Sequence, residues 1–443
     1  MTATQSSRDI FNRELGDFLD QSPTPFHAVS SMTEMLLEGG FNPLSEDDDW
    51  SLQQGGKYFV TRNGSSLIAF VVGTESLSET GIRMAGAHTD SPCLMVKPQP
   101  ELLNNQYYQL GVEVYGGALL NPWFDRDLSI AGRLIYTDKN GQLKQKLVNF
   151  HEPVAMIPSL AIHLDREANS GRKVNAQTDI PPILMQAEEK KDFQELLCER
   201  FLSQGERVMD YELCLYDVQQ AATLGLKKEF FASGRLDNLL SCFVATKALI
   251  NADTRSTSLI VCNDHEEVGS VSSVGADGPF LESVVERLCL AGQTKSESTT
   301  KARVLGNSLL ISCDNAHAVH PNFASKHDKG HSPLLNGGPV IKVNVKQRYA
   351  TNGITASLFK QLCAAVEVPV QTFVSRSDLG CGSTIGPMTS AKLGVPTLDV
   401  GIPQLAMHSC REVTGSADPQ RLTAVLSHFF NLPGKLQVEL VSD

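Results

Sequence analysis

Two adjacent glutamates follow a short apolar run in the segment LIVCNDHEEVG, residues 259 to 269. Polar residues also follow two other apolar runs: GIRMAGAHTD carries His88 and Asp90, and NSLLISCDNAH carries Asp314 and His317. Because ligands of open α/β sheets lie beyond the carboxyl ends of the strands, we expect these side chains to meet at one sheet edge. Charged groups at the end of a buried strand are costly without partners, and a metal ion removes that cost.

Two further candidates come from loop segments, Asp237 in SGRLDNLLSC and His408 in PQLAMHSCRE. Each has an ordinary structural explanation when taken alone, since Asp237 could cap a helix and a single histidine more often forms a hydrogen bond than binds a metal. Together, two histidines and three carboxylates suit a metal that binds nitrogen and oxygen, such as zinc, manganese or cobalt. This set fits a two-metal site in which one carboxylate bridges the ions.

The paired glutamates suggest a division of roles within such a site. A two-metal site lowers the pKa of a bound water, but a base must still take the proton and pass it to the leaving amine. One of the two residues, Glu266 or Glu267, can hold a metal while its neighbour acts as this base. Asp90 lies two residues after His88, on the same face of an extended segment, and can orient the imidazole.

The composition indicates a globular protein of two or three domains, with 443 residues of which 41% are hydrophobic and 20% charged. No stretch approaches the roughly 20 apolar residues of a membrane helix, and no signal peptide is evident. Ten cysteines occur at irregular intervals without a C-x-x-C pair, which favours reduced thiols. The formal net charge of −12 disfavours nucleic acid as a partner. We therefore expect a cytoplasmic protein that does not associate with membranes.

The pattern of apolar residues changes twice along the chain. Helical spacing over residues 8–38 precedes strand-like runs at SLIAFVVG and GIRMAGAH. Residues 105–160 contain only strand-like runs, the last of them VAMIPSLAI, with Asn140-Gly141 as a hairpin turn. After about residue 235, strands and helices alternate, which predicts an α/β fold with a mainly parallel sheet flanked by helices. The expected domains are residues 1–94 with 210–443, interrupted by a β-rich insert at 95–209.

The chain resembles a known family in a series of motifs: GAHTDSP, SGRLDN, HEEVGS, DNAHAVHPN, VIKVNVKQRYATN, GCGSTIGP and LAMHSCRE. They occur in the order found in the aspartyl aminopeptidases, which are co-catalytic zinc exopeptidases, and the resemblance runs from about residue 20 to near the C-terminus. It implies two zinc ions per subunit. The implied roles are ligands of one zinc for His88 and Asp314, ligands of the other for Glu267 and His408, a bridge for Asp237, a base for Glu266 and an orienting group for Asp90.

The resemblance also implies a substrate and a backbone feature. Family members remove an N-terminal aspartate or glutamate from peptides, and Lys342 in VIKVNV matches the cation that would bind the acidic side chain. The ordinary alternative is a solvent-facing lysine on an edge strand. We further expect the bond from Asp237 to Asn238 to be cis, as at the bridging aspartate of related zinc exopeptidases.

Several residues beside the matched motifs are candidates for the pocket lining: His317, Tyr349 and Ser409. Structural roles are equally compatible with their positions. The Gly-rich GCGSTIGP lacks the pattern of a phosphate loop, and we expect a tight turn that opens a helix near Ser383 or Thr384.

His163, in PSLAIHLDR, matches a family histidine that reaches the active site of a neighbouring subunit. The resemblance therefore implies that the insert is a dimerisation domain and that the protein is a homo-oligomer; the family also builds tetrahedral dodecamers. From the sequence alone, His163 is equally explained as a core or turn residue.

Two other classes of function compete with this interpretation. The metal-binding residues alone also fit a di-zinc aminopeptidase or amidohydrolase for neutral substrates, and a decayed enzyme could serve as a binding or scaffold protein. Glu266 argues against the scaffold, because scaffolding needs no general base. A serine hydrolase is disfavoured because the chain lacks G-x-S-x-G.

Overall fold

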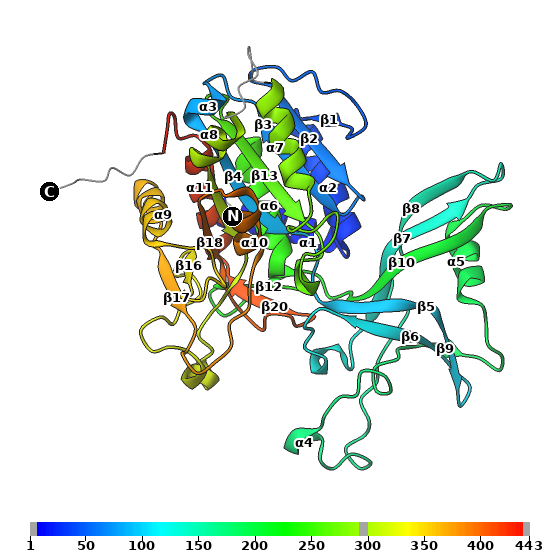
Figure 1. Cartoon of the computed structure of the whole chain (residues 1–443). Coiled ribbons are helices and arrows are strands. Elements are labelled where there is room, and N and C mark those ends of the chain that lie inside the picture. The colour runs from blue at the N-terminus through cyan, green and yellow to red at the C-terminus, as the bar shows by residue number, and fades with distance from the viewer. Residues whose placement is uncertain (1–6, 292–299, 437–443) are drawn as a thin grey trace, which may run out of the picture.

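The structure, a computed structural model, describes residues 7–291 and 300–436 and contains a larger helix-covered body and a smaller β-rich body that projects from it (Figure 1). Among the helices of these two ranges, none combines the length and apolar character that a membrane crossing demands. The predicted α/β fold with a second, mostly β unit is confirmed.

A nine-stranded mixed sheet forms the centre of the larger body. Its strands, in spatial order, are β1 (Asn42–Leu44), β2 (Lys57–Arg62), β3 (Ser66–Val71), β13 (Thr257–Asn263), β4 (Ile82–His88), β14 (Leu309–Cys313), β18 (Thr397–Gly401), β16 (Val340–Val343) and β17 (Gln371–Val374). The four strands β13, β4, β14 and β18 run parallel, whereas β3 and β16 are antiparallel to the neighbours that flank this group. The sheet is thus parallel at its centre, where the candidate residues lie.

Helices cover both faces of this sheet. Every residue of β4, β13, β14 and β18 is buried, which explains why their sequences are nearly continuous apolar runs. One face packs against α1 (Ser7–Gln21), α2 (Pro25–Glu38), α6 (Leu236–Ile250), α9 (Gly353–Ala365) and α11 (Asp418–Phe430). The other packs against α7 (Phe280–Ala291), α8 (Thr300–Gly306) and α10 (Ile385–Leu393), and the short α3 (Leu77–Thr80) contacts α8.

The predicted helical region at the N-terminus is two helices rather than one. Helix α1 ends at Gln21, and α2 begins at Pro25, a residue that is well tolerated in the first helical turn. Thr24 caps α2, because its side chain accepts a hydrogen bond from the backbone N–H of His27.

The smaller body contains a six-stranded antiparallel sheet. Its spatial order is β8 (Leu143–Asn149), β7 (Leu128–Thr137), β10 (Arg207–Asp217), β5 (Cys93–Asn104), β6 (Tyr107–Tyr115) and β9 (Ile183–Gln186). Gly141, at φ +77°, lies in the predicted turn between β7 and β8. Strand β10 pairs with β7 along its whole length, so residues 210–217, which we expected in the larger domain, belong to this sheet. The insert also contains helices α4 (Ala168–Gly171) and α5 (Phe193–Phe201).

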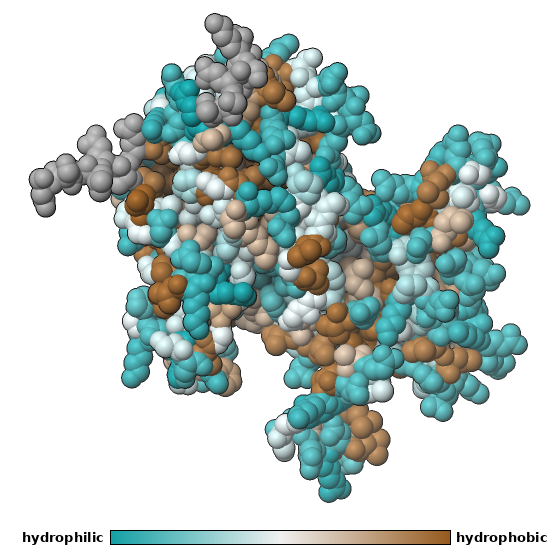
Figure 2. Space-filling model, in the orientation of Figure 1, coloured by the Kyte–Doolittle hydropathy of each residue, from teal (hydrophilic) through white to brown (hydrophobic). Residues whose placement is uncertain are grey.

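The predicted strand VAMIPSLAI does not form. Ala155 and Met156 make only isolated bridges, to Leu128 and Ile183, and the following residues have no strand pairing. Pro158 lacks a backbone N–H and cannot continue a ladder. The chain instead forms an exposed loop that carries His163 and the exposed apolar residues Leu160, Ile162 and Leu164. Figure 2 shows hydrophobic residues on the surface of the smaller body, which otherwise is largely hydrophilic.

A small five-stranded sheet contains two strands, β15 and β19, that follow the central strands β14 and β18 in the chain. It consists of β11 (Ala222–Leu224), β12 (Phe230–Ser233), β20 (Glu412–Gly415), β19 (Pro403–Leu405) and β15 (Ala316–His317). Three short 3-10 helices complete the described chain: η1 (Asn121–Trp123), η2 (Glu266–Val268) and η3 (Pro321–Lys326). Strands β15, β19 and β20 fix the loops that follow Asp314 and surround His408.

Candidate metal centre

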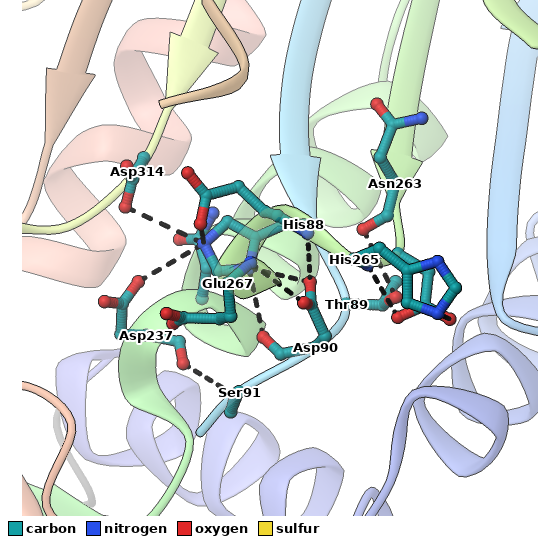
Figure 3. Close-up of polar contacts among 12 residues, drawn as sticks. His88, Thr89, Asp90, Ser91, Asp237, Asn263, His265, Glu267 and Asp314 are labelled. Carbon is teal, nitrogen blue, oxygen red and sulfur yellow. Dashed lines mark hydrogen bonds and ion pairs between the residues drawn. The ribbon is translucent and has the colours of Figure 1, made fainter. Parts of the chain in front are cut away.

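Three adjacent parallel strands deliver candidate residues to one edge of the central sheet. His88 is the last residue of β4, and Asp314 follows the last residue of its neighbour β14. On the other side of β4, strand β13 ends at Asn263 and leads into η2, which begins with Glu266 and Glu267. In Figure 3 the carboxylates of Asp237, Glu267 and Asp314 surround the imidazole of His88.

Two loop-borne residues complete the cluster. Asp237 lies at the start of α6, directly after a turn in which Arg235 adopts a left-handed conformation. The bond between Asp237 and Asn238 is cis, as predicted. His408 lies in the loop between β19 and β20.

The two carboxylate oxygens of Asp237 face two different histidines. Oδ1 lies 3.5 Å from Nε2 of His88, and Oδ2 lies 3.5 Å from Nε2 of His408. Each histidine has a second carboxylate nearby, at 3.8 Å from His88 to Asp314 and 3.3 Å from His408 to Glu267. The arrangement is therefore two groups of three side chains that share Asp237.

The cluster has the chemistry of a metal site. Ligand atoms of His88, Asp237 and Glu267 lie within 4.8 Å of one another. Asp237 Oδ1 and Glu267 Oε1 are buried without a hydrogen-bond partner in the described ranges, which is costly for carboxylates unless a cation compensates. Two imidazole nitrogens and three carboxylates match the donors that zinc prefers. The residues present fit bound zinc.

Without a cation, the cluster retains protons. Burial and the nearby charge of Asp237 raise the pKa of the Glu267 carboxyl to about 9. Burial opposes the charging of His408, but its contact with the Asp237 carboxylate outweighs burial and raises the pKa of His408 to about 9. Each proton occupies an atom that a metal ion would need.

Asp90 connects both halves of the cluster. Its Oδ1 lies 3.3 Å from Nδ1 of His88 and accepts the backbone N–H of Glu266 at 3.1 Å. Its Oδ2 accepts the backbone N–H of Glu267 at 3.0 Å and the hydroxyl of Tyr115 at 2.7 Å. Burial alone would raise the pKa of Asp90, but His88 and these hydrogen bonds hold it below its usual range. These contacts are compatible with the orienting role predicted for Asp90.

Glu266 lies at the rim of the cluster, with its Oε2 3.9 Å from Nε2 of His88. Burial raises the pKa of its carboxyl to about 7; His88 opposes this effect, and Asp314 and Asp90 add to it. A carboxyl of this pKa can accept and return a proton near neutral pH.

A cleft of about 1,180 Å³ opens above the cluster. The candidates Lys342, His317 and Tyr349 line it, together with Glu266 and Ser383. Two other candidates lie elsewhere: Ser409 lines a separate small cavity, and His163 is exposed in the loop of the smaller body. Thr384 caps helix α10, as expected for the residue that opens it.

Lys342 occupies an interior position of the central sheet. Strand β16 lies between β18 and β17, so the alternative of an edge-strand lysine is wrong. The side chain is buried, with Nζ 3.2 Å from Oδ2 of Asp314 and 5.3 Å from the ring centroid of Tyr349. Lys342 therefore contacts a predicted metal ligand as well as the cleft.

Sequence reasoning missed Glu412, which is buried on β20. One of its oxygens accepts the backbone N–H of His408 at 2.7 Å, and the other accepts the backbone N–H of Asp237 at 2.9 Å. Glu412 therefore fixes the backbone at Asp237 relative to the backbone at His408. No sequence signal marks it, because an acidic residue in a short strand usually faces solvent.

Comparison with known proteins identifies the family. The family model described as aminopeptidase I zinc metalloprotease (M18) matches residues 18–430. This chain belongs to the M18 aminopeptidase family. The predicted resemblance to the aspartyl aminopeptidase family is confirmed, and with it membership of a zinc-dependent family of peptide hydrolases.

Relatives match over nearly their whole length. A probable M18 family aminopeptidase 2 of Stutzerimonas stutzeri (strain A1501) is 54% identical over 430 residues, which cover 96% of this chain and 99% of the relative. A protein of the same name from Pseudomonas putida (strain ATCC 47054) is 55% identical over 429 residues, covering 96% and 98%.

Solved structures of M18 proteins share the fold. Ape4, seen by cryo-EM in complex with Nbr1, superposes with a TM-score of 0.92 at 38% identity, covering 97% of this chain and 87% of that one. The mApe1 dodecamer of S. cerevisiae superposes with a TM-score of 0.83 at 32% identity, covering 96% of each chain.

We expect zinc affinity to rise with pH between about 6 and 9. Zinc must displace the protons that the raised pKa values of His408 and Glu267 retain, so affinity falls as the pH drops below those values. Isothermal titration calorimetry in buffers of different ionisation enthalpy measures the protons released. Affinity independent of pH, with no proton release, would contradict this expectation.

Proposed function

We propose that this M18 protein is an aspartyl aminopeptidase, which removes N-terminal aspartate or glutamate from peptides at a two-zinc site bridged by Asp237. The observation that carries the proposal is the division of the Asp237 carboxylate between two histidines, at 3.5 Å each. A carboxylate in this position, with one further carboxylate beside each histidine, suits two ions better than one.

The proposed ligands follow the two groups. His88 and Asp314 would hold one ion, His408 and Glu267 would hold the other, and Asp237 would be shared between them. When bound, zinc supplies Lewis acidity, which polarises the scissile carbonyl and lowers the pKa of water.

Glu266 performs the proton transfers. It is the carboxylate at the rim of the cluster that is not needed as a ligand, and its side chain lines the cleft. In the proposed reaction, Glu266 takes a proton from the attacking water and gives it to the nitrogen of the leaving peptide. The new carboxylate belongs to the released amino acid, and the shortened peptide leaves with a free amino group.

Lys342 selects the acidic side chain. The carboxylates that line the cleft are assigned as metal ligands or as the base, so recognition of an acidic side chain needs a separate cation within the cleft. Lys342 is buried beside the cluster and supplies that cation.

A di-zinc aminopeptidase for neutral residues is the second candidate. The 3.2 Å contact between Lys342 and Asp314 favours it, because a lysine that already neutralises a ligand has less charge to offer a substrate. Comparison of acidic and neutral substrates separates the two candidates.

We also propose that the protein is a homo-oligomer assembled through the smaller body as a dimerisation domain, with His163 entering the cleft of a neighbouring subunit. The exposed apolar residues Leu160, Ile162 and Leu164 beside His163 support this, because an apolar loop of this kind favours a protein contact. The M18 protein mApe1 forms a dodecamer.

The first test of the mechanism is Glu266→Gln. This variant keeps the shape of the side chain but removes the proton acceptor, so kcat on an aspartyl anilide should fall about 10²- to 10⁴-fold. Zinc content per chain, measured by mass spectrometry, should remain that of the parent. The exposed Glu34 on α2 provides a control, since Glu34→Gln should leave kcat unchanged. Activity of Glu266→Gln equal to the parent would overturn the assigned base.

Specificity is tested with Lys342→Met. Loss of the contact with Asp314 should weaken hydrolysis of all substrates alike, so the informative quantity is the ratio of kcat/KM for aspartyl and leucyl anilides. We expect this ratio to fall at least about tenfold, the effect of losing a charged contact worth about 1.4 kcal/mol or more. Lys346→Met, an exposed position on the following loop, is the control. An unchanged ratio would favour the candidate for neutral residues.

Subunit complementation tests the role of His163. A mixture of His163→Ala chains with Glu266→Gln chains should regain activity, because a Glu266→Gln subunit can supply His163 to a partner that retains Glu266. Each variant alone should be weakly active. If the dissociated and reassociated mixture shows only the averaged activity of the two variants, His163 does not act across subunits.

A further inference from the structure

The segment that leaves β6, residues 115–119, reaches from the smaller body into the metal centre. Its first residue, Tyr115, donates its hydroxyl to Asp90 Oδ2 at 2.7 Å. Asp90 in turn lies against Nδ1 of His88 with both its backbone carbonyl oxygen, at 3.0 Å, and its Oδ1, at 3.3 Å, and its carboxylate accepts the backbone N–H groups of both glutamates in η2. Tyr115 thus acts on the orientation of His88 through Asp90.

The same segment holds His408 directly. The carbonyl oxygen of Gly117 lies 3.1 Å from Nδ1 of His408, and the backbone N–H of Leu119 donates to the carbonyl oxygen of His408 at 3.0 Å. In the neutral imidazole, a proton on Nδ1 that is donated to Gly117 leaves the lone pair on Nε2, which is the atom that faces Asp237 and Glu267.

The backbone of this segment lies so close to the candidate ligands that little space remains for side chains. A Cβ atom on Gly116 would lie 3.1 Å from the Cβ of Glu267, and one on Gly117 would lie 3.3 Å from Nδ1 of His408. Glycines here allow the backbone of the smaller body to contact the candidate ligands.

We infer that the smaller body contributes to the metal centre. Tyr115 and the Gly117 carbonyl are positioning groups, because they orient both candidate ligand histidines with Nε2 toward the metals. The inference rests on the zinc site of the proposed function. Neither group touches the substrate in this role; each acts through a histidine.

Two variants test the two contacts separately. Tyr115→Phe removes only the hydroxyl, and we expect one of two zinc equivalents, the one near His88, to bind about 10- to 100-fold more weakly. Gly117→Ala pushes on His408, and we expect the other equivalent to weaken; Gly117 has no positive φ, so its backbone accepts alanine without strain. Competition with a chromophoric chelator measures both affinities without reference to activity.

The controls share the chemistry but not the location. Tyr107→Phe changes an exposed tyrosine of the same strand, and Gly353→Ala adds a methyl group with no atom within 4 Å. Both should bind zinc like the parent. Saturating zinc should restore most of the kcat of Tyr115→Phe with an unchanged KM, a rescue that a merely unfolded variant would not show. If Tyr115→Phe does not fold, Gly117→Ala alone decides.

The outcomes separate this inference from the proposed function. Zinc affinities equal to the parent in both variants would overturn the inference, even if the parent hydrolyses aspartyl peptides. Weakened affinities in a protein that does not hydrolyse aspartyl peptides would support the inference and overturn the proposed function. A parent that binds no zinc would overturn both.

Discussion

The structure depends on the burial of several ionisable side chains around one aspartate. Asp237 is only 3% exposed, and its carboxylate faces two histidines while four other carboxylates lie around the same cluster. Such a group of acids would repel one another in an apolar interior, so the site requires either protons or cations. The raised pKa values of Glu267 and His408 reflect this requirement, and zinc meets it in the family to which the chain belongs.

The surrounding fold fixes these groups through backbone hydrogen bonds rather than through a rigid loop. Asp90 accepts the N–H groups of η2, and Glu412 accepts those of Asp237 and His408. Each buried acid therefore joins segments that are far apart in the sequence, and each is satisfied by backbone donors. A metal site built this way keeps its geometry because the central parallel sheet is fully buried.

The residues that could be predicted from the sequence are those at strand ends. His88, Asp314 and the paired glutamates follow apolar runs, and parallel strands bring their carboxyl ends to one edge. Glu412, Tyr115 and Gly117 could not be found this way. Glu412 acts on Asp237, which is 175 residues away, and Gly117 acts on His408 through a backbone carbonyl. Tyr115 reaches Asp90 because β5 and β6 pair as a hairpin, and a tyrosine at the end of a strand carries no sequence signal of that contact. The prediction of a strand at VAMIPSLAI was wrong for a reason that the sequence itself contains. The apolar pattern suggested strand pairing, but Pro158 prevents it.

Charge at the cleft links metal binding to substrate choice. In the proposed site, two zinc ions bring four positive charges, and the ligands Asp237, Glu267 and Asp314 remove three. Glu266 and Asp90 add two negative charges, and Lys342 returns one positive charge, so the whole centre is close to neutral. A neutral centre gives an acidic side chain no long-range attraction, and selectivity must come from direct contact with a cation in the cleft, which both Lys342 and Arg348 line. Because Lys342 also lies 3.2 Å from Asp314, the lysine proposed to select the substrate contacts a proposed metal ligand as well, so a change at this position would act on both properties.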